Sequence, residues 1–236
     1  MNRTTSLFLG FSLAASALFS MGAGCGNSTS TTGSGGTTGS GGTTSSSHAA
    51  NSSAASTGTG GSPAATLDCA SYCGEIMTNC ATTNAQFTDM ATCMGTCAGY
   101  AKVTIDDKGG NTLGCRIYHA GAPAKMDPVM HCPHAGITGG DKDPKGTTGV
   151  CGEPCDAFCD VALVACAGQP LEYATKAACM TECQAFKADT TSYNTSDTAK
   201  DDMGCRMYHL TAASKDTAAA AIHCAHIHAV SPVCTM

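Results

Sequence analysis

A pattern of five cysteines occurs twice in this chain of 236 residues, and it restricts the possible folds more than any other feature. Each cysteine of the first set recurs in the second at a constant offset of 86. The sets are Cys69, Cys73, Cys80, Cys93 and Cys97, and Cys155, Cys159, Cys166, Cys179 and Cys183. A repeat of fixed period indicates that each copy is one structural unit. We therefore expect two related modules in tandem.

Shorter blocks extend the duplication beyond these cysteines. Residues 114–119 read Gly-Cys-Arg-Ile-Tyr-His, and residues 204–209 read Gly-Cys-Arg-Met-Tyr-His. A His-Cys-x-His block follows at 131–134 and again at 223–226, and each copy closes on a Val-Cys pair. Each copy therefore owns eight cysteines, and of the 17 in the chain Cys25 is left over.

The cysteine content predicts disulfides and not thiol chemistry. A module of this size buries too little apolar surface to be stable without cross-links, and the chain has no Trp. An even number of cysteines in a small module is typical of a disulfide framework in an oxidising compartment. Zinc ligation is the alternative, but the Cys-x3-Cys spacing and the even count fit it less well. We expect four disulfides in each copy.

Residues 1–24 have the features of a secretory signal peptide. Arg3 is the only charged residue, and the apolar region after it is too short to span a membrane. The segment Met21-Gly22-Ala23-Gly24-Cys25 resembles the lipobox of bacterial lipoproteins, in which the cysteine receives a diacylglyceryl group and becomes the mature N-terminus. This resemblance implies lipidation of Cys25, and Gly26 after it implies export to the outer membrane.

The leftover cysteine supports the lipid anchor independently, because an odd cysteine in a secreted protein needs a chemical fate. Acyl chains on Cys25 would bind the membrane without a transmembrane helix. The alternative is an ordinary secreted protein that is cleaved near Ala17, with Cys25 free or bonded to another chain. After the cysteine, residues 26–66 are nearly all Gly, Ser, Thr, Ala or Asn and carry no charge. We expect a disordered tether from this composition.

The two modules, residues 67–151 and 152–236, are predicted to be mainly helical. Asp68 is a suitable N-cap for a helix in which Cys69, Cys73 and Cys80 share one face. A second helix is expected after Thr88-Asp89. In the second module, the equivalent helices are expected from Pro154 and after Ala174-Thr175. Third helices are expected at 113–119 and 203–209, and fourth helices after Asp127-Pro128 and Asp216-Thr217.

The first two helices of each module resemble the twin Cys-x3-Cys helical hairpins of several small oxidised proteins. In an antiparallel hairpin of this kind, the outer and inner cysteines of the two helices would pair. The pairs would be Cys69 with Cys97 and Cys73 with Cys93, and then Cys155 with Cys183 and Cys159 with Cys179. The resemblance carries no activity, and eight cysteines allow 105 connectivities.

Histidine is the candidate for a binding site. Six histidines fall at repeated positions, and one more follows in the second copy: His119, His131 and His134, then His209, His223, His226 and His228. His-x2-His at helical spacing places two imidazoles on one face, and a third from a neighbouring helix would complete a three-nitrogen site for copper or zinc. Non-covalent haem is a further alternative. Histidine also caps helices and forms hydrogen bonds in small cores, and that structural role is the default interpretation.

Arg116 and Arg206 stand in the repeated block, and we expect them to pair with carboxylates of the preceding loops. Those carboxylates are Asp106 or Asp107 in the first copy, and Asp201 or Asp202 in the second. The alternative role is an anion clamp for a ligand.

The remaining signals exclude several functions. The chain has no Walker-type phosphate loop, no Gly-x-Ser-x-Gly elbow and no His-Glu-x-x-His motif. Its net charge is −6, without a Lys/Arg cluster, which gives no support to nucleic-acid binding. We assign no catalytic residue.

As a whole, the chain resembles the uncharacterised cysteine-rich surface lipoproteins with Ser/Thr/Gly tethers that are abundant in myxobacterial-type genomes. The Cys-Arg-x-Tyr-His and His-Cys-x-His blocks carry this likeness. It implies a location and no activity. The sequence therefore predicts a membrane-anchored, non-enzymatic module that interacts with a protein or glycan partner. A metal- or haem-binding lipoprotein is the first alternative, and a redox or metal-dependent enzyme is the second.

Overall fold

The computed structural model describes residues 66–170 and 173–235. The predicted signal peptide, the lipobox cysteine Cys25 and the tether up to residue 65 lie outside the described residues. Within the described ranges the fold is helical, without a strand, and the only bridge between extended segments is the isolated pair Ala101 and Thr112. The predicted mainly α fold is confirmed.

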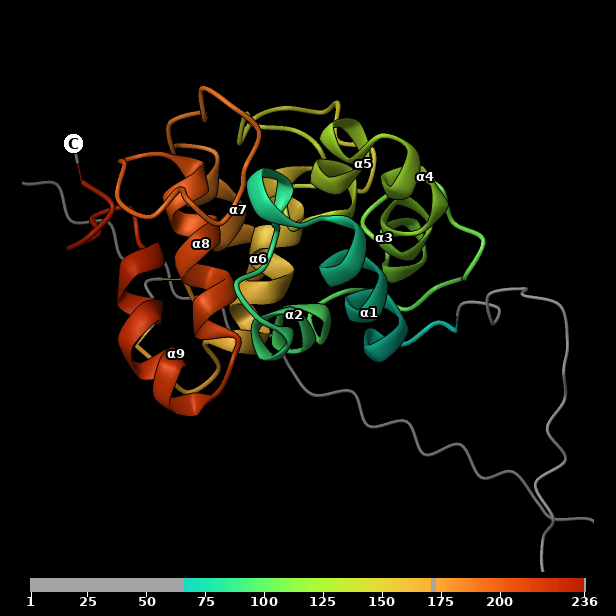
Figure 1. Ribbon diagram of the computed structural model, residues 1–236. Coiled ribbons are helices and arrows are strands. Elements are labelled where there is room, and N and C mark those ends of the chain that lie inside the picture. The colour runs from blue at the N-terminus through green and yellow to red at the C-terminus, as the bar shows by residue number, and fades with distance from the viewer. Residues whose placement is uncertain (1–65, 171–172, 236) are drawn as a thin grey trace, which may run out of the picture. The chain divides into compact units, whose positions relative to one another are not determined.

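Residues 67–151, called copy one here, contain five α-helices and one 3-10 helix (Figure 1). They are α1 Cys69–Asn79, η1 Thr82–Asn84, α2 Met90–Cys97, α3 Leu113–Ala120, α4 Ala122–Met126 and α5 Pro128–Ala135. Residues 152–236, copy two, are described except at 171–172 and 236. Their helices are α6 Pro154–Ala165, α7 Lys176–Cys183, α8 Met203–Ala213, α9 Thr217–His223 and η2 Cys224–Ile227. Among the described residues, no helix has the length and apolar character needed to cross a membrane.

The helices begin where the sequence places their caps. The Asp68 side chain accepts a hydrogen bond from the Ser71 amide at 2.8 Å at the start of α1. Asp89 does the same for Thr92 in a complete capping box at the start of α2. These side chains satisfy amide groups that have no partner inside the helix. Pro154 takes the first turn of α6, as predicted.

Helix α4 was not predicted. It spans only five residues, Ala122–Met126, too few for an apolar periodicity, and starts beside Pro123 directly after the end of α3. The helix matters for the site below because it connects α3 to α5 and packs against both.

In the part of the chain that the structure describes, eight disulfides cross-link the fold, and each joins two cysteines of the same copy. In the two hairpins the structure brings together the pairs that the helical-hairpin resemblance implied: Cys69–Cys97, Cys73–Cys93, Cys155–Cys183 and Cys159–Cys179. The other four bonds are Cys80–Cys132, Cys115–Cys151, Cys166–Cys224 and Cys205–Cys234. This content of disulfides is typical of an extracytoplasmic protein.

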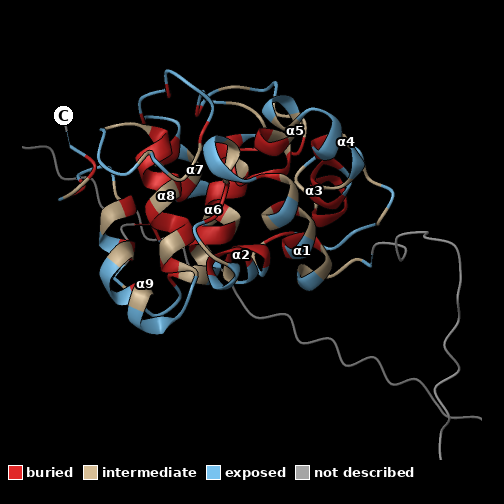
Figure 2. Ribbon diagram, in the orientation of Figure 1, coloured by how far each residue is buried: buried red, intermediate tan, exposed pale blue. Residues whose placement is uncertain are grey.

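Buried side chains of both copies belong to one hydrophobic core. Helix α6 is largely buried, whereas α9 exposes most of its surface (Figure 2). Helix α2 of copy one packs against α8 of copy two at the close approach of Gly95 to the Ser214 backbone. The Ser214 hydroxyl donates a hydrogen bond of 3.1 Å to the Thr92 carbonyl oxygen, and Lys215 pairs with Asp89 at 3.0 Å. The two copies therefore dock through helix packing and polar contacts.

Candidate metal centre

Three of the predicted histidines of copy one come together between α3 and α5. His119 lies in the last turn of α3, and His131 and His134 lie one turn apart on α5, which runs beside α3 (Figure 1). One ring nitrogen from each histidine lies within 4.8 Å of the other two. The Nδ1 atoms of His119 and His131 are 3.0 Å apart. We call these three residues site 1.

Copy two repeats this arrangement with His209 of α8, His223 of α9 and His226 of η2, which we call site 2. The Nδ1 of His209 is 3.0 Å from the Nδ1 of His223 and 3.2 Å from the Nδ1 of His226. The two sites have the same composition, and Nδ1 of the central histidine faces a second Nδ1 in both. His228 lies outside the cluster: its carbonyl oxygen accepts a hydrogen bond from Arg206 Nε at 3.2 Å, and its ring faces that of Tyr173.

Backbone carbonyls fix the tautomer of the central histidine in both sites. Nε2 of His119 lies 3.3 Å from the Lys108 carbonyl oxygen, and Nε2 of His209 lies 3.3 Å from the Thr198 carbonyl oxygen. A carbonyl oxygen can only accept, so Nε2 carries the hydrogen and Nδ1 presents a lone pair. A hydrogen bond from the second ring nitrogen to a carbonyl is the usual support of a metal-ligating histidine.

Hydrogen bonds between the imidazoles do not satisfy the inner nitrogens evenly. In site 2, the single lone pair of His209 Nδ1 faces two imidazole nitrogens. In site 1, Nδ1 of His134 is buried and has no hydrogen-bond partner among the described residues. An ion at the centre of each set would be shared by all three nitrogens.

The distances between the inner nitrogens are close to those between neighbouring ligands of one small metal ion. Zinc binds nitrogen at about 2.0–2.1 Å, so two nitrogens of a tetrahedral site lie roughly 3.3 Å apart. The separations of 3.0 and 3.2 Å around His209 are close to that value. Axial ligands of a haem stand on opposite sides of the porphyrin, so nitrogens in direct contact do not suit the haem alternative.

Burial favours the neutral form of several of these imidazoles, and a neutral imidazole is the form that binds a metal. Burial lowers the pKa of His134 to about 4, with the neighbouring His119 and His131 adding to the effect. Burial likewise lowers the pKa of His209 to about 4, followed by the influence of His226. Burial also lowers the pKa of His223. A neutral cluster costs no proton release when an ion binds at neutral pH.

Disulfides hold the helices that carry the site residues. Cys132 stands between His131 and His134 and is bonded to Cys80 at the end of α1. Cys115, one turn before His119, is bonded to Cys151. The sulfur atoms of that bond also lie near His119, but a disulfide sulfur is not a thiolate and does not act as a structural metal ligand. The same frame recurs in copy two.

Both sites lie next to surface pockets. His131 lines a pocket of about 400 Å³, and the equivalent His223 lines one of about 410 Å³. The first pocket is mainly apolar and belongs to α3, α4 and α5. The second is more polar and lies between the copies, because it includes Asp89 of copy one and Lys215 of copy two. One imidazole of each site therefore lines a surface pocket.

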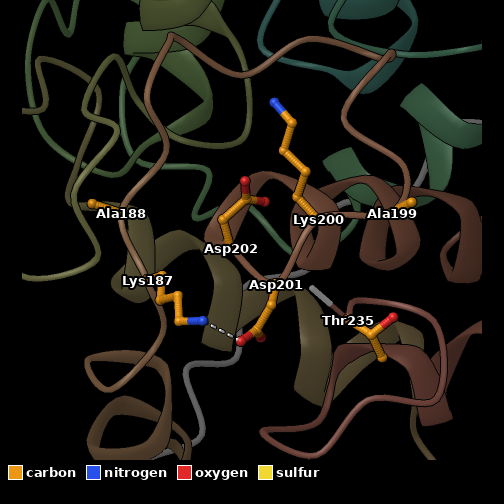
Figure 3. Close-up of a pocket in the computed structure, with 7 residues that line it drawn as sticks. All are labelled: Lys187, Ala188, Ala199, Lys200, Asp201, Asp202 and Thr235. Atoms are coloured by element: carbon orange, nitrogen blue, oxygen red, sulfur yellow. Dashed lines mark hydrogen bonds and ion pairs between the residues drawn. The ribbon is translucent and has the colours of Figure 1, made fainter.

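A further hollow of about 490 Å³ in copy two contains no histidine (Figure 3). Lys187 and Asp201 line it and form an ion pair at 2.7 Å. Asp201 also pairs with the buried Arg206 at 2.9 Å, as predicted for that arginine. In copy one the prediction is wrong: the Arg116 guanidinium lies over the ring of Tyr100 at 3.9 Å and has no carboxylate partner among the described residues. We do not assign the hollow a function.

Two parts of the sites could not be identified from the sequence. The carbonyl groups of Lys108 and Thr198 come from loops, and a carbonyl partner leaves no side-chain signal. The sequence showed only that the two loops precede the same repeated block, at 114–119 and at 204–209.

Residues 43–151, which include copy one, match a family model described as the BfoA family C-terminal domain. This region is similar to that domain, and its described part, residues 66–151, is a cysteine-rich helical domain cross-linked by disulfides. No curated protein and no solved structure matches the chain.

Proposed function

We propose that this chain is an exported metal-binding protein that holds one transition-metal ion in each copy through three imidazoles. The observation that carries the proposal is the convergence of three Nδ1 atoms at His209, His223 and His226, while Nε2 of His209 is engaged by a backbone carbonyl. Neutral imidazole suits zinc and copper. Three protein nitrogens leave a coordination position for water or an exogenous ligand.

The N-terminal sequence and the disulfides support a location at the outer membrane. Lipidation of Cys25 and the uncharged stretch 26–66 would hold the two sites close to, but not on, the outer membrane. A root-mean-square reach of about 35 Å is expected for roughly forty residues of a flexible Gly-rich chain. A protein or glycan partner is compatible with this location.

Titration of the metal-free chain with Zn²⁺, followed by isothermal calorimetry, tests the proposal. Two ions per chain are expected. The double variant His131→Ala/His134→Ala should bind one ion, at site 2. The double variant His223→Ala/His226→Ala should bind one ion, at site 1. His228→Ala is the matched control and should still bind two. Both double variants should keep the wild-type circular dichroism spectrum, because eight disulfides hold the helices.

Failure of the wild-type chain to bind Zn²⁺ or Cu²⁺ at either set would overturn the proposal. Equal stoichiometry in the wild type and in both double variants would do the same, because the ions would then be bound elsewhere. In either case the histidines would be structural residues, and the predicted interaction module would become the leading function.

A further inference from the structure

The two sites differ in the residues around them although their histidines are the same. Met130 precedes His131 in site 1, whereas Ile222 precedes His223 in site 2. Met126, at the end of α4, lines the same pocket as His131, and no methionine lines the pocket beside His223. Of these two pockets, only the one beside site 1 has a methionine in its lining.

Both of these methionines are exposed to solvent. The exposed fraction is 87% for Met126 and 54% for Met130. Neither side chain contributes much to the core at this exposure, so burial does not explain why they stand there. Methionine is flexible and its sulfur is polarizable, which suits adaptable contacts at a surface.

Helical spacing directs one of them toward the site. Met130 and His134 are four residues apart on α5, so their side chains lie on the same face of the helix. On the other flank, Met126 and His131 share the pocket with the half-exposed Tyr118. Met126 therefore shares a surface pocket with one imidazole of site 1, and Met130 lies on the helix that carries two of the three.

We propose that copy one takes up Cu(I), and that Met126 and Met130 capture the ion before it passes to site 1. Thioether ligands select Cu(I), whereas zinc prefers imidazole and thiolate. The transfer is ligand exchange: a sulfur–copper bond breaks as a bond from an imidazole lone pair forms. The copper stays in oxidation state +1, and an imidazole whose inner nitrogen carries the ring hydrogen binds after that hydrogen has moved to its other ring nitrogen. Site 2 lacks the thioethers and has no such preference. This inference rests on the proposed metal-binding function.

The test uses the full chain with site 2 removed by His223→Ala/His226→Ala, so that only site 1 reports. Cu(I) affinity is measured without oxygen against a chromophoric Cu(I) chelator, and Zn²⁺ affinity is measured by calorimetry. In this background, Met126→Leu/Met130→Leu should lower the Cu(I) affinity at least tenfold and leave the Zn²⁺ affinity within twofold. Met90→Leu is the control, because Met90 is 48% exposed on α2, away from the site.

A second readout follows the methyl groups directly. In protein labelled with ¹³C at the methionine methyls, Ag⁺ serves as a redox-inert substitute for Cu(I). It should shift the Met126 and Met130 signals and leave the Met90 signal in place. Unchanged Cu(I) affinity in the double methionine variant, or methyl signals that do not move with Ag⁺, would overturn the inference while Zn²⁺ binding still supported the proposed function. Absence of binding by every metal would overturn both.

Discussion

Cys132 is bonded to Cys80 and lies on α5 between His131 and His134, the two histidines that α5 contributes to site 1. The disulfide therefore fixes α5 at the site itself. The equivalent bond of copy two joins Cys166 to Cys224, which stands between His223 and His226. The disulfide framework and the candidate metal sites therefore depend on the same few residues.

Removal of the Cys80–Cys132 bond should weaken metal binding in copy one alone. The bond spans 52 residues, and its loss is expected to cost about 4 kcal/mol of stability through the entropy of the unfolded chain. We expect Cys80→Ala/Cys132→Ala to lower the Zn²⁺ affinity of site 1 at least tenfold, with site 2 unchanged, in a calorimetric titration. The control is Cys69→Ala/Cys97→Ala, which removes the bond between the start of α1 and the end of α2. This variant should have a lower stability but an unchanged Zn²⁺ affinity. Equal loss of affinity in both variants would contradict the local role.

Gly95 should be intolerant of any side chain because α2 approaches α8 there. A Cβ atom at Gly95 would lie 1.8 Å from the Ser214 carbonyl oxygen, so the backbone of one helix would have to move. We expect Gly95→Ala to lower the free energy of unfolding by about 2–3 kcal/mol.

Gly74→Ala provides the comparison for that change. Nothing lies within 4 Å of the Cβ position on α1, so this variant should be more stable than the wild type by about 0.5–1 kcal/mol. Urea unfolding measures both. A Gly95→Ala variant as stable as Gly74→Ala would mean that the two copies do not pack through these helices.

Asp189 should make the stability of the chain depend on pH in an unusual direction. Burial raises the pKa of this carboxyl group from 3.8 to about 7, with Asp202 and Asp197 adding to the effect. The folded state then holds a proton that the unfolded state releases above pH 4, so stability should decrease from about pH 4 to 7 and then level off.

Asp189→Asn removes that titration and keeps an oxygen that can accept from the Gly204 amide. As the pH rises from 5 to 8, the free energy of unfolding of the variant should increase by about 2 kcal/mol relative to that of the wild type. Urea unfolding at the two pH values measures this difference. Exposed Asp106, changed to Asn, should follow the wild-type curve. A constant difference between Asp189→Asn and the wild type at both pH values would contradict the account.

Metal removal should lower the thermal stability of the folded chain. An ion that binds only the folded state adds about 2.7 kcal/mol per site at a free concentration of 100 Kd. Addition of a chelator to the loaded chain should therefore lower Tm, and the shift should be about half as large in His131→Ala/His134→Ala. If the chelator lowered Tm by the wild-type amount in a variant that lacks both histidine pairs, the ions would be bound elsewhere.

The sequence was sufficient to predict the helices and their starts where local chemistry decides them. Asp68 and Asp89 cap helices whose cysteines lie on one face, and each cap acts within three residues. The short α4 was missed because five residues have no measurable period. The contact of Gly95 with Ser214 was not predictable, since it joins residues far apart in the chain and depends on the docking of the two copies.

The candidate site was only partly predictable for the same reason. The repeated blocks selected His119, His131 and His134, and helical spacing indicated that the last two share a face. Their meeting with His119 depends on how α5 packs against α3, which follows from the disulfides and from α4. The sequence alone therefore favoured a structural role for these histidines.

X-ray absorption at the zinc edge of the loaded chain tests the central claim most directly, because it reports the ligand atoms themselves. We predict three imidazole nitrogens at about 2.0–2.1 Å from the metal and one further light atom, with no sulfur. The same spectrum is expected from His131→Ala/His134→Ala, at half the metal content, because sites 1 and 2 share one ligand set. A first shell of oxygen atoms without imidazole, or one that contains thiolate sulfur, would contradict it.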